Sequence, residues 1–185
     1  MSLSFPEPES EGAEDAELVR QALAGRGAGF DAIVRRHGPR VFRYLLQLAR
    51  HREDAEDLTQ QTFLKAYRHL AAFDTSHSLI AWLLTIGRRT ALNHFRDSRR
   101  WEPLTDREAA PAAAPDAAAE ARDLRENLWD RARARLSARE FEVLWLRFGE
   151  GLSTQETARV LGLTQPHVKI IVYRAKQALT KGMKP

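Results

Sequence analysis

The sequence has 185 residues, room for one medium domain or two small ones, and 43% of them are hydrophobic, enough for packed cores. The absence of cysteine excludes a disulfide framework and a thiolate metal site, and the histidines are scattered without ligand spacing, so we expect no metal and no cofactor. The net charge is only +4, but cations gather at residues 88–100 and 153–185, which indicates two contacts with nucleic acid or, alternatively, two solvated helix faces.

Residues 1–17 are acidic and contain no lysine or arginine, and we expect a disordered tail there. This segment has neither the basic start nor the apolar run of a signal peptide. The sequence also has no stretch of about 18 consecutive apolar residues, the length that a membrane span needs. We therefore expect a soluble, cytoplasmic protein.

Residues 18–100 are predicted to form a first helical domain. An apolar period typical of a helix runs from Phe30 to Leu48, and Gly38-Pro39 is expected to break it. The stretch "HREDAEDLTQQTFLKAYRHL" predicts a long helix after it. Because no segment alternates like a strand, the predicted fold class is all-α.

The long helix has one informative residue, Leu64, which lies in the middle of a polar face. An apolar centre with a polar rim is typical of a protein–protein contact, whereas a single exposed leucine is also ordinary. The polar residues of this face are Asp57, Gln60, Gln61 and Arg68.

The stretch "SLIAWLLTIGRRTALNHFRDSRR" predicts the next helix and carries the first basic cluster. Arginine interleaved with aromatic residues suits single-stranded nucleic acid, because phosphates pair with the cations while bases stack on the rings; a solvated face is the alternative. The loop before it, "FDTSHS" (residues 73–78), has polar side chains that would either hydrogen-bond a base edge or cap the helix. The arginines of the cluster are Arg88, Arg89, Arg96, Arg99 and Arg100.

Residues 101–120, with three prolines and an aperiodic run of alanine, predict a linker before a second helical domain at residues 121–185. In that domain Ser137 and Ser153 each precede a glutamate by three residues, which predicts two capped helix starts. Gly149 is expected to end the first of these helices. An i, i+3, i+4, i+7 stripe is predicted to be core: Phe141, Leu144, Trp145 and Phe148.

A helix-turn-helix needs a small residue where its helices cross, a turn residue that tolerates positive φ, and an apolar anchor in the second helix. Ala158, Gly162 and Val168 meet these needs at the spacing of the motif. The outer arc of the second helix is expected to enter a major groove; an ordinary hairpin with solvated cations is the alternative. This arc contains Gln165, His167, Lys169, Ile170, Tyr173 and Arg174.

In chain order, "DAEDLTQQTFLKAY", "AWLLTIGRR" and the helix-turn-helix resemble the extracytoplasmic-function sigma factors of bacterial RNA polymerase, in the sigma-70 family. The resemblance covers about residues 28–100 and 130–180. It implies two helical domains, called region 2 and region 4, that dock on core polymerase and direct it to promoter DNA. It also implies an anti-sigma factor that covers the same faces.

The resemblance assigns residues to three contacts. One face of region 2 would engage the clamp helices of the β′ subunit, the loop and helix after it would hold the −10 element, and region 4 would read the −35 element as duplex and touch the β flap. The implied contacts with core polymerase are Asp57, Leu58, Gln60, Phe63 and Leu64. The implied −10 contacts are Phe73, Asp74, Ser76, His77, Trp82, Arg88, Arg89 and Arg96. The implied −35 contacts are Thr164, Gln165, Pro166, His167, Lys169, Ile170, Tyr173, Arg174 and Lys176.

Two departures from the family pattern affect the DNA contacts. Arg89 stands where the family often has asparagine, so no −10 base preference is carried over. Ile170 stands where the family often has a polar residue, and our hypothesis is that it contacts a thymine methyl group.

Three other function classes fit the sequence less well. The stretch "LSAREFEVLWLRFGEGLSTQETARVLGL" also resembles the DNA-binding module of LuxR-type transcriptional regulators, but residues 18–100 show no sign of the α/β domain that such regulators usually carry. An enzyme is not expected, because no Gly-rich phosphate loop and no supported Ser/His/Asp arrangement is present. A protein-interaction adaptor is a further alternative, which co-purification without promoter-dependent transcription would indicate.

Overall fold

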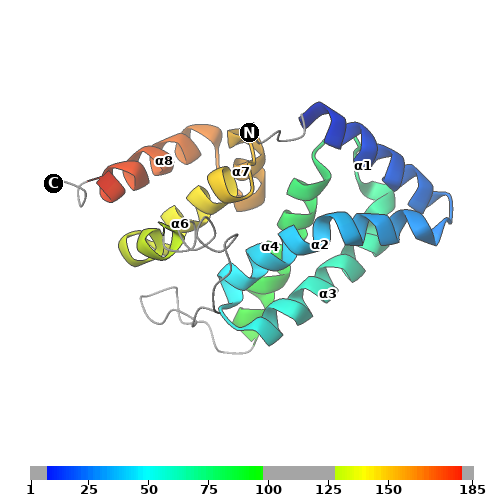
Figure 1. Ribbon diagram of the computed structural model, residues 1–185, viewed down its shortest axis with the longest axis horizontal. Coiled ribbons are helices and arrows are strands. Elements are labelled where there is room, and N and C mark those ends of the chain that lie inside the picture. Colours follow the sequence, from blue (N-terminus) through cyan, green and yellow to red (C-terminus); the bar gives the residue numbers. More distant parts are fainter. Residues whose placement is uncertain (1–7, 98–127, 181–185) are drawn as a thin grey trace, which may run out of the picture. The chain divides into compact units, whose positions relative to one another are not determined.

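The computed structural model describes residues 8–97 and 128–180, in two compact units divided at residue 100 (Figure 1). Every regular element in these described ranges is helical, which confirms the predicted all-α class. The linker predicted at 101–120 and the first seven residues of the predicted tail lie outside them. The first unit contains α1 (Pro8–Leu23), α2 (Gly27–Ala49), α3 (Arg52–His69), the 3-10 turn η1 (Leu70–Ala72) and α4 (Leu79–Asp97).

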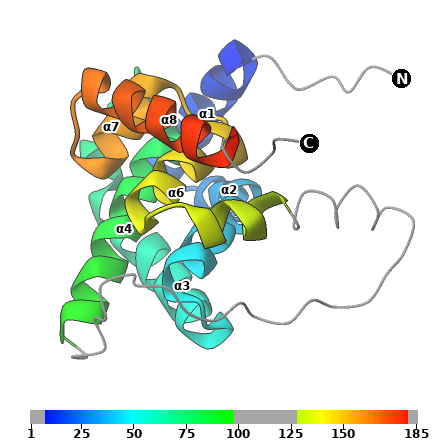
Figure 2. The ribbon, with the colours of Figure 1, turned by 90° about the vertical axis from the view of Figure 1, so that its left-hand side faces the viewer.

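The long helix α2 is the centre of the first unit, and α1, α3 and α4 all pack against it (Figures 1 and 2). The predicted break at Gly38-Pro39 is wrong, because α2 runs through Pro39 without interruption. A proline in a helix interior removes one backbone hydrogen bond and costs about 3 kcal/mol. Ile33 and Val41, on either side of it, are fully buried. Burial of such side chains contributes about 1.5–3 kcal/mol each, so packing on the neighbouring helices offsets the cost.

Residues 8–17 belong to helix α1, so the expectation of a disordered tail is wrong for that part of it. Asp15 is buried, and its Oδ1 accepts a hydrogen bond from His37 Nε2 at 2.9 Å. Arg36 approaches the same oxygen at 3.5 Å and donates to Glu14 at 2.6 Å. Two of the acids that favoured disorder in the sequence, Glu14 and Asp15, therefore anchor α1, because α2 offers them partners.

Helices α3 and α4 pack on each other and on α2. Gly87 of α4 faces Thr62 of α3, where a Cβ would lie 3.4 Å from the Thr62 hydroxyl. Lys65 Nζ of α3 donates a hydrogen bond to Thr90 Oγ1 of α4 at 3.1 Å. These contacts hold in place the two helices that carry the predicted surfaces of the first unit.

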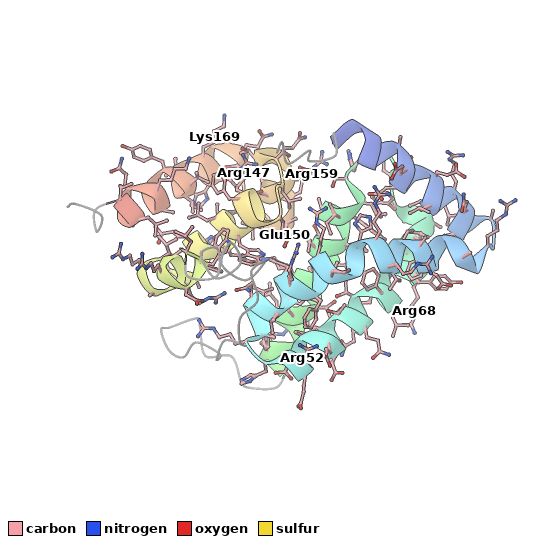
Figure 3. All side chains as sticks on the ribbon, viewed as in Figure 1. Arg52, Arg68, Arg147, Glu150, Arg159 and Lys169 are labelled. Atoms are coloured by element: carbon pink, nitrogen blue, oxygen red, sulfur yellow. The ribbon has the colours of Figure 1, made fainter. Side chains whose placement is uncertain are left out.

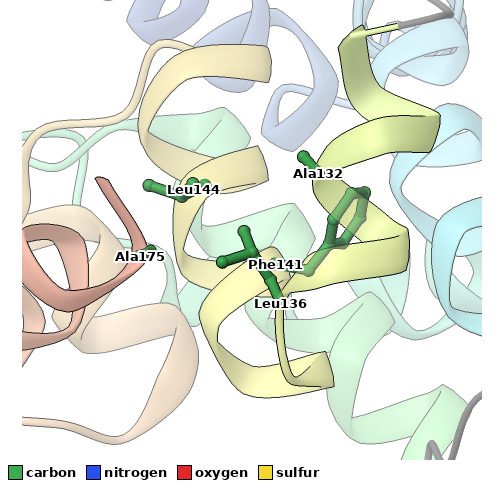
Figure 4. Packing of buried hydrophobic residues seen from close by; sticks show 5 residues of the cluster. All are labelled: Ala132, Leu136, Phe141, Leu144 and Ala175. Carbon is green, nitrogen blue, oxygen red and sulfur yellow. The ribbon is translucent and has the colours of Figure 1, made fainter. Parts of the chain in front are cut away.

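The second unit contains a helical segment at residues 128–135, α6 (Ala138–Leu144), the π-helical turn η2 (Trp145–Gly149), α7 (Thr154–Leu161) and α8 (Gln165–Thr180). Both predicted capping boxes are present: Ser137 and Ser153 accept the backbone N–H of Glu140 and Glu156, and those carboxylates accept the serine N–H in return. A buried cluster joins the segments of this unit (Figure 4): Ala132, Leu136, Phe141, Leu144 and Ala175.

The stripe predicted to be core is only partly buried. Phe141 and Leu144 are buried and Trp145 packs against them, but Phe148 is 53% exposed. The reason is η2, in which the N–H of Glu150 bonds the Trp145 carbonyl five residues back. A π turn holds more residues than an α turn, so Phe148 no longer lies above Leu144. The prediction that Phe148 is core is wrong.

Candidate functional site

Helix α7, the turn after it and α8 form the predicted helix-turn-helix (Figure 2). Gly162 ends α7 in the left-handed conformation, with φ 66°, and its N–H bonds the carbonyls of Ala158 and Arg159. Thr164 Oγ1 accepts the backbone N–H of His167 at 3.4 Å, at the start of α8. Because Val168 and its neighbours on one side of α8 are buried, the turn determines which face of α8 meets solvent.

The solvent face of α8 is basic and contains two large apolar residues. Ile170 is 50% exposed and Tyr173 is 65% exposed, whereas Ile171 and Ala175 are buried. Figure 3 shows Lys169 projecting outward from α8. All the residues implied for the −35 contact are exposed: Thr164, Gln165, Pro166, His167, Lys169, Ile170, Tyr173, Arg174 and Lys176.

Phe148, which was predicted to be core, lies next to this basic surface. Lys176 Nζ lies 5.1 Å from the centroid of the Phe148 ring, and the Arg147 guanidinium lies 5.7 Å from it. Arg147 also donates to the Leu152 carbonyl, which ties η2 to the loop before α7. The exposed ring therefore holds one of the predicted DNA-binding cations toward η2.

The loop at residues 73–78 is a hydrogen-bonded turn. Asp74 Oδ1 accepts the backbone N–H of Ser76 at 2.9 Å, and His77 Nε2 lies 3.8 Å from Asp74 Oδ2. Ser78 Oγ accepts a backbone N–H of the first turn of α4 at 3.3 Å. Ser78 thus caps the helix, while Asp74, Ser76 and His77 are exposed.

An aromatic pair joins this loop to α4. Phe73 packs against Trp82 with ring centroids 5.0 Å apart, and both rings are half-buried. Arg89 and Arg96 are exposed and follow Trp82 at intervals of seven residues, so all three lie on one side of α4. Arg88 is half-buried and makes other contacts. Two arginines of the predicted cluster lie outside the described residues: Arg99 and Arg100.

Helix α3 presents the predicted polar face, with Leu64 at its centre, 53% exposed. Asp57 and Gln60 are exposed beside it. Leu58 and Phe63, implied as partner contacts, are 0% and 7% exposed. These two assignments need correction, because the side chains pack beneath the face and offer no surface to a partner.

Tyr67 belongs to the same face of α3, although the sequence did not lead us to predict it as part of the contact with core polymerase. It is 61% exposed, and its ring lies edge-on to Phe30 of α2 with centroids 5.0 Å apart. Figure 3 shows the neighbouring Arg68 pointing away from α3. Its position three residues after Leu64 was enough to predict that it shares this face, because residues three apart are neighbours on a helix surface. The apolar centre of the face is therefore a pair, Leu64 and Tyr67.

Residues 8–97 and 128–180 contain no group of three or more His, Cys, Asp or Glu side chains placed to hold a metal ion. The same ranges contain no helix with the length and apolar character needed to cross a bilayer.

Two family models match the chain, one in each unit. The model described as "Sigma-70 region 2" matches residues 33–101, and the model described as "Sigma-70, region 4" matches residues 127–179. The sequence is 34% identical over 181 residues to the ECF RNA polymerase sigma factor BldN of Streptomyces coelicolor, covering 95% of this chain and 68% of that protein. It is 32% identical over 165 residues to the ECF RNA polymerase sigma factor SigL of Mycobacterium tuberculosis, covering 87% of this chain and 92% of that one.

Solved structures resemble the chain as well. A chain in the structure of CnrH in complex with the cytosolic domain of CnrY matches with a TM-score of 0.67 and 26% identity, over 91% of this chain and 96% of that chain. A chain in the co-crystal structure of the sigma factor RpoE with the anti-sigma factor NepR from Bartonella quintana matches with a TM-score of 0.63 and 24% identity, over 82% and 94%. The second likeness concerns the fold alone.

Proposed function

Because the chain belongs to the extracytoplasmic-function sigma factors of bacterial RNA polymerase, we propose that α3 binds core polymerase while α4 and α8 bind promoter DNA. As an RNA polymerase sigma factor the chain serves transcription initiation. The LuxR-type alternative is not favoured, because the region 2 family model matches residues 33–101. The proposed role assigns no catalytic step to this chain.

The exposed Leu64 and Tyr67 on α3 are the observation that carries the polymerase contact. Two large apolar side chains beside exposed Asp57 and Gln60 give an apolar centre with a polar rim. Aromatic residues held rigidly are frequent anchors of protein interfaces, and Phe30 holds the Tyr67 ring from the side. We therefore assign this face to the β′ clamp helices of the polymerase.

We assign the two DNA contacts by asking whether each surface suits single-stranded or duplex DNA. On α4, half-buried Trp82 and exposed Arg89 and Arg96 suit the single strand of the −10 element, since bases stack on rings and phosphates pair with cations. On α8, the exposed basic face of a helix-turn-helix suits the major groove of the −35 element. The second unit is also proposed to touch the β flap.

Core polymerase makes the two weak DNA contacts cooperative. Each surface alone offers few phosphate contacts, so the free chain is expected to bind promoter DNA poorly. Once polymerase holds both units, binding at the second element becomes effectively intramolecular. The protein would act in the cytoplasm and associate with the nucleoid when it directs polymerase to DNA.

An anti-sigma factor is a further proposed partner. CnrH, whose structure this chain resembles at 26% identity, is in complex with the cytosolic domain of a second protein, CnrY. In this chain, the exposed apolar pair Leu64 and Tyr67 is a surface that such a partner would cover, in competition with polymerase.

Co-elution with bacterial core polymerase lacking sigma tests the proposal. The wild-type chain is expected to co-elute stoichiometrically, and Gln60→Ala combined with Leu64→Asp is expected to abolish co-elution, because a charge replaces the apolar centre. Leu23→Asp is the matched control, since Leu23 is 51% exposed, on α1, and lies outside the assigned face. Absence of wild-type binding, or equal loss in the control, would contradict the proposed polymerase face.

A further inference from the structure

We propose that Ile170 and Tyr173 together form an apolar notch on α8 that seats the 5-methyl group of one thymine in the −35 element. The inference rests on the proposed function and names the group that this surface reads. It adds Tyr173 to the earlier hypothesis about Ile170 and makes the pair, rather than one residue, the unit of recognition.

The exposure of the two side chains is the first support. Ile170 is 50% exposed and Tyr173 is 65% exposed, although both lie on a helix that buries Val168, Ile171 and Ala175 on its other side. Residues three apart on a helix are neighbours, with Cβ atoms roughly 5–6 Å apart. The pair therefore presents two adjacent apolar side chains to solvent, against which a methyl group can pack.

The positive charges around Ile170 and Tyr173 indicate which ligand the pair binds. Lys169 and Arg174 are exposed directly beside it, and Lys176 is exposed one turn further along α8. Three cations around an apolar centre match a ligand that has phosphates outside and an apolar group between them. Duplex DNA offers this arrangement in its major groove, where the thymine 5-methyl group is the apolar feature of the base edges.

The size of the expected effect follows from the size of the group. Removing one methyl group from a buried apolar contact weakens binding about fourfold. A lost cation contact acts differently, because phosphates carry no sequence information and binding falls for every sequence alike. The ratio of affinities for thymine and uracil therefore isolates the notch from the cations.

The experiment uses the chain reconstituted with core polymerase and a library of duplexes with a randomised −35 element. The tightest selected duplex is expected to contain thymine, and replacing one particular thymine by deoxyuridine is expected to weaken wild-type binding about fourfold. Ile170→Ala and Tyr173→Ala are each expected to bind the thymine and uracil duplexes equally. Tyr173→Phe keeps the wall and retains the preference, and Lys169→Ala lowers both affinities with their ratio unchanged.

Each other outcome has a definite meaning. Three outcomes overturn the notch and leave the sigma-factor function standing: a selected element without thymine, a wild type that binds thymine and uracil duplexes equally, or a uracil penalty that survives in either alanine variant. If the reconstituted wild-type complex selects no −35 sequence at all, the proposed role of α8 fails, and the notch fails with it.

Discussion

Gly162 follows the last residue of α7 and Gly87 lies inside α4, and their backbone conformations differ in whether they require glycine. Gly162 ends α7 with φ 66°, a conformation that costs a residue with a side chain about 1–2 kcal/mol. Gly87 lies inside α4 without a positive φ, and a Cβ there would lie 3.4 Å from Thr62 Oγ1 and 3.5 Å from Leu45 Cδ2. Of these two positions, only Gly162 requires glycine, because only its φ angle is positive.

Replacing Gly162 by alanine is therefore expected to lower the free energy of unfolding of the second unit by about 1–2 kcal/mol. Because this residue sets the turn that aims α8, binding to the −35 element should weaken as well. Urea denaturation followed by circular dichroism measures the first effect. The same substitution at Gly87 is the control and is expected to leave stability unchanged or raise it by up to about 1 kcal/mol, since alanine favours a helix interior. Equal losses at the two positions would contradict the argument.

At the scale of the elements, the attachment of α1 to α2 combines a buried polar pair with a close backbone approach. His37 is 2% exposed and Asp15 is 6% exposed. At Gly29 of α2 a Cβ would lie 2.6 Å from the backbone nitrogen of Ala22, so the two helices pass too close for any side chain there. Helix α1 is thus an integral part of the first unit.

Asp15→Ala is expected to lower the free energy of unfolding of the first unit by about 1–3 kcal/mol, because His37 Nε2 would stay buried without its acceptor. Urea denaturation measures the loss, and hydrogen exchange shows whether α1 opens first. Glu14→Ala is the matched control: its carboxylate also meets α2, through Arg36, but 64% of that side chain is exposed. Exposed ion pairs contribute less than about 1 kcal/mol, so a control as destabilised as Asp15→Ala would refute the buried-pair account.

At the scale of the whole molecule, the cations proposed to bind DNA are divided between two units. The first carries exposed Arg89 and Arg96, and the second carries exposed Lys169, Arg174 and Lys176. Each unit alone can neutralise only a few phosphates, which explains why promoter binding should depend on a polymerase that holds both.

Lys169→Ala is expected to weaken promoter binding by the reconstituted polymerase, with a salt dependence whose logarithmic slope is smaller by about 1. The loss should be similar for all promoter sequences, because the contact proposed for Lys169 is to a phosphate. Equilibrium binding at a series of salt concentrations gives both quantities. Gln177→Ala, exposed on the same helix but uncharged, should leave the slope unchanged. An unchanged slope in Lys169→Ala would show that this cation lies away from the DNA.

Several features of this chain were determined by short stretches of sequence. The capping boxes at Ser137 and Ser153, the left-handed turn at Gly162 and the buried anchor at Val168 all follow from residues within one or two helical turns. The exposed face of α8 could be predicted for the same reason, because a regular helix with a known buried side has a known outer side. These are interactions between residues close in the chain, and they do not depend on distant partners.

Other features were decided only by tertiary packing. Pro39 stays inside α2 because neighbouring helices bury the residues around it, and the acidic Asp15 becomes helical because His37 lies opposite. Leu58 does not belong to the predicted contact face, because its side chain on α3 is buried in the core. Phe148 is exposed because the π-helical turn η2 holds one more residue than an α-helical turn. At each of these positions the local sequence had a real structural preference. The structure that formed depended also on residues packed there from other parts of the chain, and a local sequence pattern contains no information about those residues.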